Sequence, residues 1–271
     1  MKKYLPPLIC CSALFSMLAE TSEANDSGFA VGLGSHVQYF DYEEFNANGR
    51  SLNQEQGGLP GLYFFGRYTH NHLQHQLTAT LLAGDIDYDG QTQTGMAHQT
   101  TTKTLLYSLS YRLEADVLPE RLAAYFAANW DYWSRSIQPA GAIIGLDETY
   151  RWPSLALGLK LPLISSGKRA LHVSTAYLHI LKGKFTVDLS ALDFGEPELI
   201  LGSGNGFEST LSYTLKLLHG RKAGIDFYYR QWSFAESDPK TINNGANTLT
   251  FLEPRSESKR IGLTFWLAVP F

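Results

Sequence analysis

The sequence predicts an all-β fold, a single antiparallel transmembrane β-barrel of ten strands. Three observations favour this class. Apolar residues alternate with small or polar residues in ten separate segments, which places the apolar side chains of each segment on one face of a strand. The connections between the segments alternate between short and long. An aromatic content of 13% and 24 glycines fit a barrel with aromatic girdles and closely packed strands.

The N-terminal region is expected to be an export signal. Two lysines precede an apolar stretch at 8–18, and a small-x-small cleavage site follows it. The stretch is too short to span a bilayer. We therefore expect two segments, a signal peptide at 1–24 and a barrel domain at 25–271. Cys10 and Cys11 both lie in the signal, so the barrel domain contains no cysteine and no disulfide framework is expected.

The first five predicted strands each carry apolar residues at every second position. The clearest is the fourth, where Leu105, Tyr107 and Leu109 alternate with Leu106, Ser108 and other inward residues. Such alternation indicates one face toward lipid and one toward the lumen. The five apolar stretches lie at 29–39, 62–68, 77–83, 105–113 and 122–132.

The second five predicted strands follow the same rule and end at the last residue. In the final segment Ile261, Phe265, Leu267 and Phe271 share one face, and Arg260 lies on the other. The five stretches lie at 155–161, 171–177, 211–217, 225–229 and 261–271.

The lengths of the connections support a membrane barrel over a soluble sandwich. A sandwich also contains strands with alternating apolar residues, but nothing in its fold makes short and long connections alternate along the chain. Membrane barrels have short periplasmic turns and long external loops. The long connections are expected near 43–58, 85–99, 134–149, 179–205 and 235–258. Two further strands within 184–203 would give twelve, and both counts are even.

The C-terminal strand resembles the last strand of bacterial outer-membrane β-barrels. The resemblance implies location in the cell outer membrane, contact with membrane lipid and lipopolysaccharide, and recognition by the barrel-assembly machinery through the strand ending at Phe271. The net charge of −4 gives no reason to expect nucleic acid as a partner. The oligomeric state stays open.

The inward positions are polar and carry both signs of charge. Because a ten-stranded barrel is narrow, such charges should pair and form a plug. The alternative is a channel for small solutes. The inward charged residues are Arg112, Glu114, Asp131, Lys160, Glu208, Lys216, Asp226, Arg230 and Arg260.

The most specific chemical signal is the segment AGDIDYDG with Asp85 and Asp87. Two carboxylates on one strand face can share a proton or a water, which suits a general base. An Asp-x-Asp pair at the top of the third strand resembles half of the omptin protease site. The resemblance implies an Asp-x-His pair on the fourth external loop, but that loop offers Asp188, Asp193 and a basal His179 without such a pair. Asp85, Asp87 and His179 are therefore the candidate catalytic residues.

The specific role is not set by these patterns. We expect an integral outer-membrane barrel whose surface loops have a structural or binding role, with a surface endopeptidase or a small-solute pore as alternatives. No cofactor and no metal are expected. His70, His72 and His75 cluster at a turn, but no thiol or carboxylate stands beside them to complete a metal site.

Overall fold

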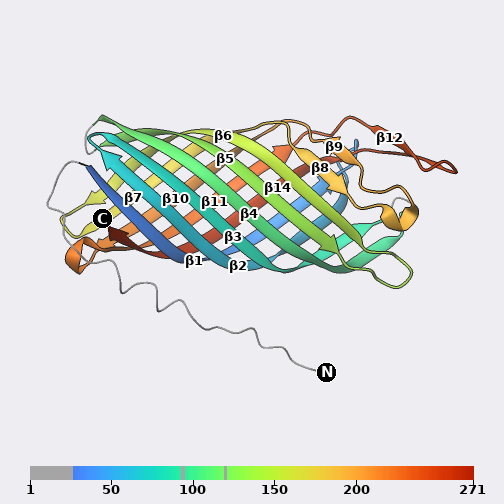
Figure 1. The fold of residues 1–271 in the computed structure, drawn as a ribbon, viewed down its shortest axis with the longest axis horizontal. Helices are drawn as coiled ribbons and strands as arrows, with labels where there is room; N and C mark the ends of the chain where they lie inside the picture. Colours follow the sequence, from blue (N-terminus) through green and yellow to red (C-terminus); the bar gives the residue numbers. More distant parts are fainter. Residues whose placement is uncertain (1–26, 93–94, 119–120) are drawn as a thin grey trace, which may run out of the picture.

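A computed structural model of the chain describes residues 27–92, 95–118 and 121–271. The predicted signal at 1–24 lies outside the described residues. Ten antiparallel strands form a closed ring (Figure 1). In order around the ring they are β1 (Ser27–Phe45), β2 (Ser51–His70), β3 (Leu73–Gln91), β4 (Ala97–Leu118), β5 (Leu122–Ile137), β6 (Leu146–Ser165), β7 (Arg169–Ile180), β10 (Gly204–Lys216), β11 (Lys222–Phe234) and β14 (Arg255–Pro270).

The ring closes between the first and the last strand. β1 pairs with β14 from Ala30 opposite Pro270 to Phe45 opposite Arg255. The Phe271 amide donates a hydrogen bond of 2.8 Å to the carbonyl oxygen of Phe29. Since every strand of the ring has two neighbours, no strand edge of the ring is left for lipid to cover. The prediction of a ten-stranded barrel is confirmed.

Short elements lie outside the ring and project from one end of the barrel (Figure 1). β8 (Lys184–Val187) pairs with the outer end of β6, beyond the point where β7 stops, and β9 (Glu198–Ile200) pairs with β8. The twelve-strand alternative is therefore wrong, because neither strand enters the ring. β12 (Lys240–Asn243) and β13 (Thr248–Phe251) form a separate hairpin, and the 3-10 turn Ser190–Leu192 lies between β8 and β9. A second 3-10 turn, Leu218–Gly220, connects β10 to β11 at the opposite end of the barrel (Figure 1).

An apolar belt surrounds the periplasmic half of the ring, and the external half extends beyond it. The outward side chains of each strand are apolar over the segments identified in the sequence, for example from Phe29 to Tyr39 in β1 and from Ile261 to Leu267 in β14. We take these segments as the membrane-spanning parts of the strands, because exposed apolar side chains in a continuous band match a hydrocarbon environment. No helix among the described residues is long and apolar enough to cross a membrane.

The strands continue well beyond this belt, and their apolar parity changes there. In β1 the apolar side chains point outward up to Tyr39, whereas Phe40 and Tyr42 point inward and are buried. In β3 the change falls between Ala83, which is outward, and Ile86, which is buried. Lipid surrounds the belt and water surrounds the external half, so most apolar side chains face outward in the belt and inward beyond it. A small inward cluster of Phe65 and Trp266 lies within the belt.

Two expectations therefore need correction. Most of the predicted long loops are strand: only residues 46–50 connect β1 to β2, because the hydrogen-bond ladder continues after the apolar alternation has ended. The interior is also not polar throughout, because its external half contains a large apolar core. That core includes Phe40, Leu59, Leu82, Ile86, Leu106, Trp152, Leu178, Ile180, Trp232 and Phe234.

Candidate ligand cavity at the external mouth

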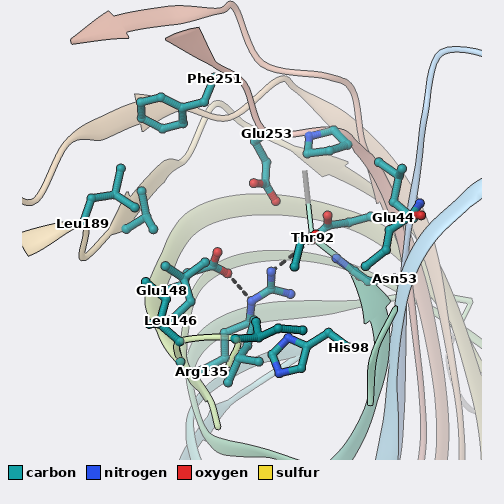
Figure 2. A pocket seen from close by; sticks show the side chains of 18 of the residues that line it. Glu44, Asn53, Thr92, His98, Arg135, Leu146, Glu148, Leu189, Phe251 and Glu253 are labelled. Atoms are coloured by element: carbon teal, nitrogen blue, oxygen red, sulfur yellow. Dashed lines mark hydrogen bonds and ion pairs between the residues drawn. The ribbon is translucent and has the colours of Figure 1, made fainter. Parts of the chain in front are cut away.

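A cavity of about 640 Å³ opens at the external mouth of the barrel. Figure 2 shows Arg135 at its floor, with Glu148 beside it and Glu253 facing it from above. Glu44 and His98 also line it. Its walls are mainly apolar and come from the ends of several strands and from the external segments. They include Ile137, Ile143, Leu146, Phe185, Val187, Leu189, Leu249 and Phe251.

Arg135 on β5 is the centre of the floor and binds three carboxylates from three other strands. Its Nη1 lies 2.8 Å from Glu55 Oε1 on β2, and its Nη2 lies 3.1 Å from Glu44 Oε1 on β1. Its Nε donates to Glu148 Oε2 on the neighbouring strand β6. All four side chains are at least nine-tenths buried. The guanidinium therefore connects strands that are not adjacent in the ring.

A fourth carboxylate, that of Glu253, reaches the same site from the segment before β14. Its Oε1 accepts hydrogen bonds from Tyr150 at 2.8 Å and from Tyr42 at 3.2 Å. The backbone of Glu253 is bonded in both directions to Ser237, with distances of 2.8 and 2.9 Å. Thus the base of the β12–β13 segment is fastened to the mouth through one buried acid.

Aromatic rings enclose the arginine. The guanidinium carbon of Arg135 lies 5.2 Å from the ring centres of Tyr42 and Trp133 and 5.3 Å from that of Tyr150. These rings also pack on one another, since Trp133 and Tyr150 stack at 4.9 Å. Cation–π contacts gain strength where water is excluded, so this cage favours a fixed guanidinium.

Four carboxylates around one cation cannot all be ionised cheaply in a buried site. These groups lie beyond the membrane belt, on the water side. Burial raises the pKa of Glu55 to about 7, with Arg135 opposing the change and Glu148 and Glu44 adding to it. Burial, together with repulsion from Glu44 and Glu148, raises the pKa of Glu253 well above its ordinary value. Both carboxyl groups therefore keep a proton to a higher pH than a solvated glutamate does.

The sequence-predicted candidates lie elsewhere. Asp85 and Asp87 share one face of β3, as expected, but that face is the outer wall above the belt, and both side chains are exposed. Asp85 stands opposite Lys103 in the β3–β4 ladder. His179 is exposed on the outer face of β7, where its Nδ1 lies 3.3 Å from Asn205 Oδ1. β4, β5 and β6 separate it from β3, so the structure does not bring His179 to the aspartates.

Comparison with known structures identifies the architecture. The outer membrane protease OmpT from Escherichia coli is similar in fold, with a TM-score of 0.55 and 10% identity over 93% of this chain and 99% of that chain. The β domain of the Bordetella autotransporter BrkA gives a TM-score of 0.43, with 10% identity over 87% of this chain and 98% of that chain. The Pseudomonas putida toluene transporter TodX gives a TM-score of 0.35, with 9% identity over 91% and 90%. The last two structures share less of the fold with this chain than OmpT does. No protein-family model and no curated protein matches the sequence.

The chain is an outer-membrane β-barrel protein. Its apolar belt and its ring of ten strands place it in the cell outer membrane. An identity of 10% to OmpT shows the shared fold alone.

Ion pairs cross the lumen of this outer-membrane barrel at the level of the belt, as the sequence predicted. Asp131 on β5 lies 3.1 Å from Arg230 on β11 and 3.6 Å from Arg260 on β14, which stands directly across the ring. Nearer the periplasm, Glu114 lies 2.6 Å from Arg112 and 2.5 Å from Lys160. Asp131 is completely buried. Below the external cavity the lumen is thus bridged by the Asp131 pairs, whereas the Glu114 pairs join β4 and β6 along one side of the ring.

Sequence reasoning missed the mouth residues of the barrel. Glu44, Glu55 and Glu148 lay in segments taken as external loops, where an acidic residue is ordinarily solvated. A usable signal was present: Glu44 has the parity of the buried Phe40 and Tyr42, and Arg135 has that of Trp133. Beyond the belt, a charged residue at the same alternate positions as the buried apolar residues points into the barrel.

Proposed function

We propose that this barrel is a surface binding protein with a closed lumen, and that the cavity at its external mouth is the binding site. The observation that carries the proposal is the position of the cavity, which opens to the outside and lies above the Asp131 bridge. Its volume lies in the range of cavities that hold small organic ligands, and its apolar walls with a few convergent polar groups are typical of such sites. Membrane lipid and lipopolysaccharide would surround the belt.

A binding barrel and a small-solute pore differ in conductance. Pure protein inserted into a planar bilayer should give no channel steps, because buried ion pairs cross the lumen. Insertion is checked independently by the shift in gel mobility on heating, which separates folded from unfolded barrel. Regular single-channel steps from folded protein would contradict the closed lumen and favour the pore.

Binding at the mouth is tested by filling the cavity. A set of small organic probes is screened by saturation-transfer NMR against the barrel in nanodiscs. Leu249→Trp places a larger ring in the cavity wall and should abolish the signal. Thr241→Trp is the matched control, because Thr241 lies on the same hairpin but is exposed and does not line the cavity. Equal signals from both variants would contradict the proposed site.

The surface endopeptidase is the second candidate. What supports it is the placement of Asp85 and Asp87 side by side on one exposed face of β3, within reach of a peptide outside the cell. A histidine to activate water is not brought to them by β7.

A further inference from the structure

The rim of the mouth cavity exposes apolar side chains to water. Ile144, Leu192 and Leu252 line the cavity and are 53%, 48% and 38% exposed. They belong to external segments far along the strands from the belt, so lipid does not cover them. Apolar surface that is gathered around an opening and left in water commonly marks a ligand or partner site.

The floor beneath this rim is short of positive charge. Glu44, Glu148 and Glu253 line the cavity, and Arg135 is the only lysine or arginine among its described lining residues. Glu148 is 6% and Glu253 5% exposed. Each uses one carboxylate oxygen in the hydrogen bonds described above, while the second oxygen has no partner among the described residues. Two buried acids therefore present unused acceptors to the cavity.

An apolar wall and an acidic floor select one kind of ligand. An anion would be repelled by the floor, and a neutral apolar molecule would leave the carboxylate oxygens without partners. A positive group with at least two N–H donors satisfies them, and an apolar body covers the walls and the rim. The chemistry is that of an amphipathic organic amine.

We propose that the mouth cavity binds an organic monocation with an apolar body, whose ammonium or amidinium group lies between Glu148 and Glu253. This rests on the proposed binding function and names the ligand class of the same site. The cation is held at the mouth because the ion pairs below carry more arginine and lysine than acid.

Three probes of one shape and different charge test the class. Titration calorimetry in nanodiscs compares 4-phenylbutylammonium, 4-phenylbutanol and 4-phenylbutyrate, with empty nanodiscs subtracted. The ammonium probe should bind at least tenfold more tightly than the alcohol, and the carboxylate probe should bind most weakly. Equal affinity of the amine and the alcohol would overturn the cation class but leave the cavity as a binding site. Absence of binding by all three would count against the proposed function itself.

Matched variants locate the charge. Glu253→Gln keeps an acceptor for Tyr42 and Tyr150 but cannot become a carboxylate, so it should weaken the amine about tenfold without weakening the alcohol. Glu257→Gln is the control, because Glu257 is an acid at the outer wall paired with Arg255 at 3.1 Å, and its removal should change neither affinity. An amine affinity unchanged by Glu253→Gln in folded protein would overturn the proposal.

A rim variant covers the case in which Glu253→Gln does not fold. Leu252 is partly exposed, so Leu252→Lys should be tolerated. The new cation at the rim should weaken the amine and strengthen the carboxylate probe, each by severalfold. Unchanged affinities for both probes would contradict a charge-selective cavity at this position.

Discussion

The two charged regions inside the barrel have opposite balances. At the level of the belt, one acid is shared by two cations at each bridge: Asp131 by Arg230 and Arg260, and Glu114 by Arg112 and Lys160. At the external mouth, one cation is shared by several acids around Arg135. Ion pairs inside the barrel thus have a positive excess at the belt and a negative excess at the mouth.

This difference in charge balance suits the belt region to stabilising the barrel and the mouth to binding a ligand. The Asp131 bridge joins strands on opposite sides of the ring, and each lower acid is already paired with two cations. The mouth joins strands too, but its fourth acid, Glu253, has no cation of its own. A cation drawn to the mouth meets like charge further down, so the arrangement favours retention over passage.

The largest effect is expected at the mouth. Arg135→Met removes the only cation from three buried carboxylates, and it should lower the free energy of unfolding by about 3–5 kcal/mol. The measurement is the urea midpoint followed by the heat-dependent gel shift. Arg255→Met, which removes an exposed arginine paired with Glu257, is the control and should cost less than about 1 kcal/mol. Similar midpoints for the two variants would show that the mouth cluster does not stabilise the barrel.

A somewhat smaller effect is expected at the lower bridge. Asp131→Asn keeps the shape and an oxygen acceptor for Ser108 but leaves Arg230 and Arg260 without an anion. We expect a loss of about 3 kcal/mol in the free energy of unfolding. Because the bridge contributes to closing the lumen, the folded variant is also measured in planar bilayers. A urea midpoint equal to that of the unaltered barrel would show that the Asp131 bridge does not stabilise the fold as the mouth cluster does.

The mouth should respond to pH. The pKa of Glu55 is raised from 4.5 to about 7 in the folded chain, so the folded state binds a proton more tightly than the unfolded state. Its contribution to stability is therefore fully present below pH 4.5 and falls as the pH rises to about 7, by on the order of 3 kcal/mol. The raised pKa of Glu253 acts on stability with the same sign.

Glu55→Gln checks the origin of this pH dependence. The variant keeps an oxygen for Arg135 and cannot lose a proton, so its urea midpoint should vary less between pH 5 and 8 than that of the unaltered barrel. Glu257→Gln, which changes an acid outside the cluster, should leave the variation as it is. A stability that rises with pH in this range would have the wrong sign for raised carboxyl pKa values.

The smallest effect on stability is expected at Asp85. The side chain is exposed on the outer wall, so Asp85→Asn should change the free energy of unfolding by less than about 0.5 kcal/mol. If Asp85 and Asp87 activate water, the same variant abolishes hydrolysis of basic peptides by the folded barrel. Hydrolysis that continues at an unchanged rate would exclude Asp85 from that role.

The sequence alone determined the fold to the level of the ring. Strict alternation in ten segments, together with loops sorted by length, is a local property that survives without knowledge of tertiary contacts. It located the strands in the belt, and it placed Asp131, Arg230 and Arg260 in the lumen. Residues 184–203 could not be settled locally, because the pairing of β8 with β6 depends on where β7 ends.

Only the tertiary structure decided the site. Glu44, Glu55, Arg135, Glu148 and Glu253 are far apart in the chain, and each alone is an ordinary charged residue near a strand end. They meet because closure of the ring directs them to one level of the same lumen, above the membrane, where the interior is an apolar core. The Asp85–Asp87 pair was visible in the sequence because its neighbours are local, but its outward direction follows from the parity that lipid imposes on β3. Local pattern fixes which residues share a face, whereas the solvent on each side of the closed barrel decides what that face contacts.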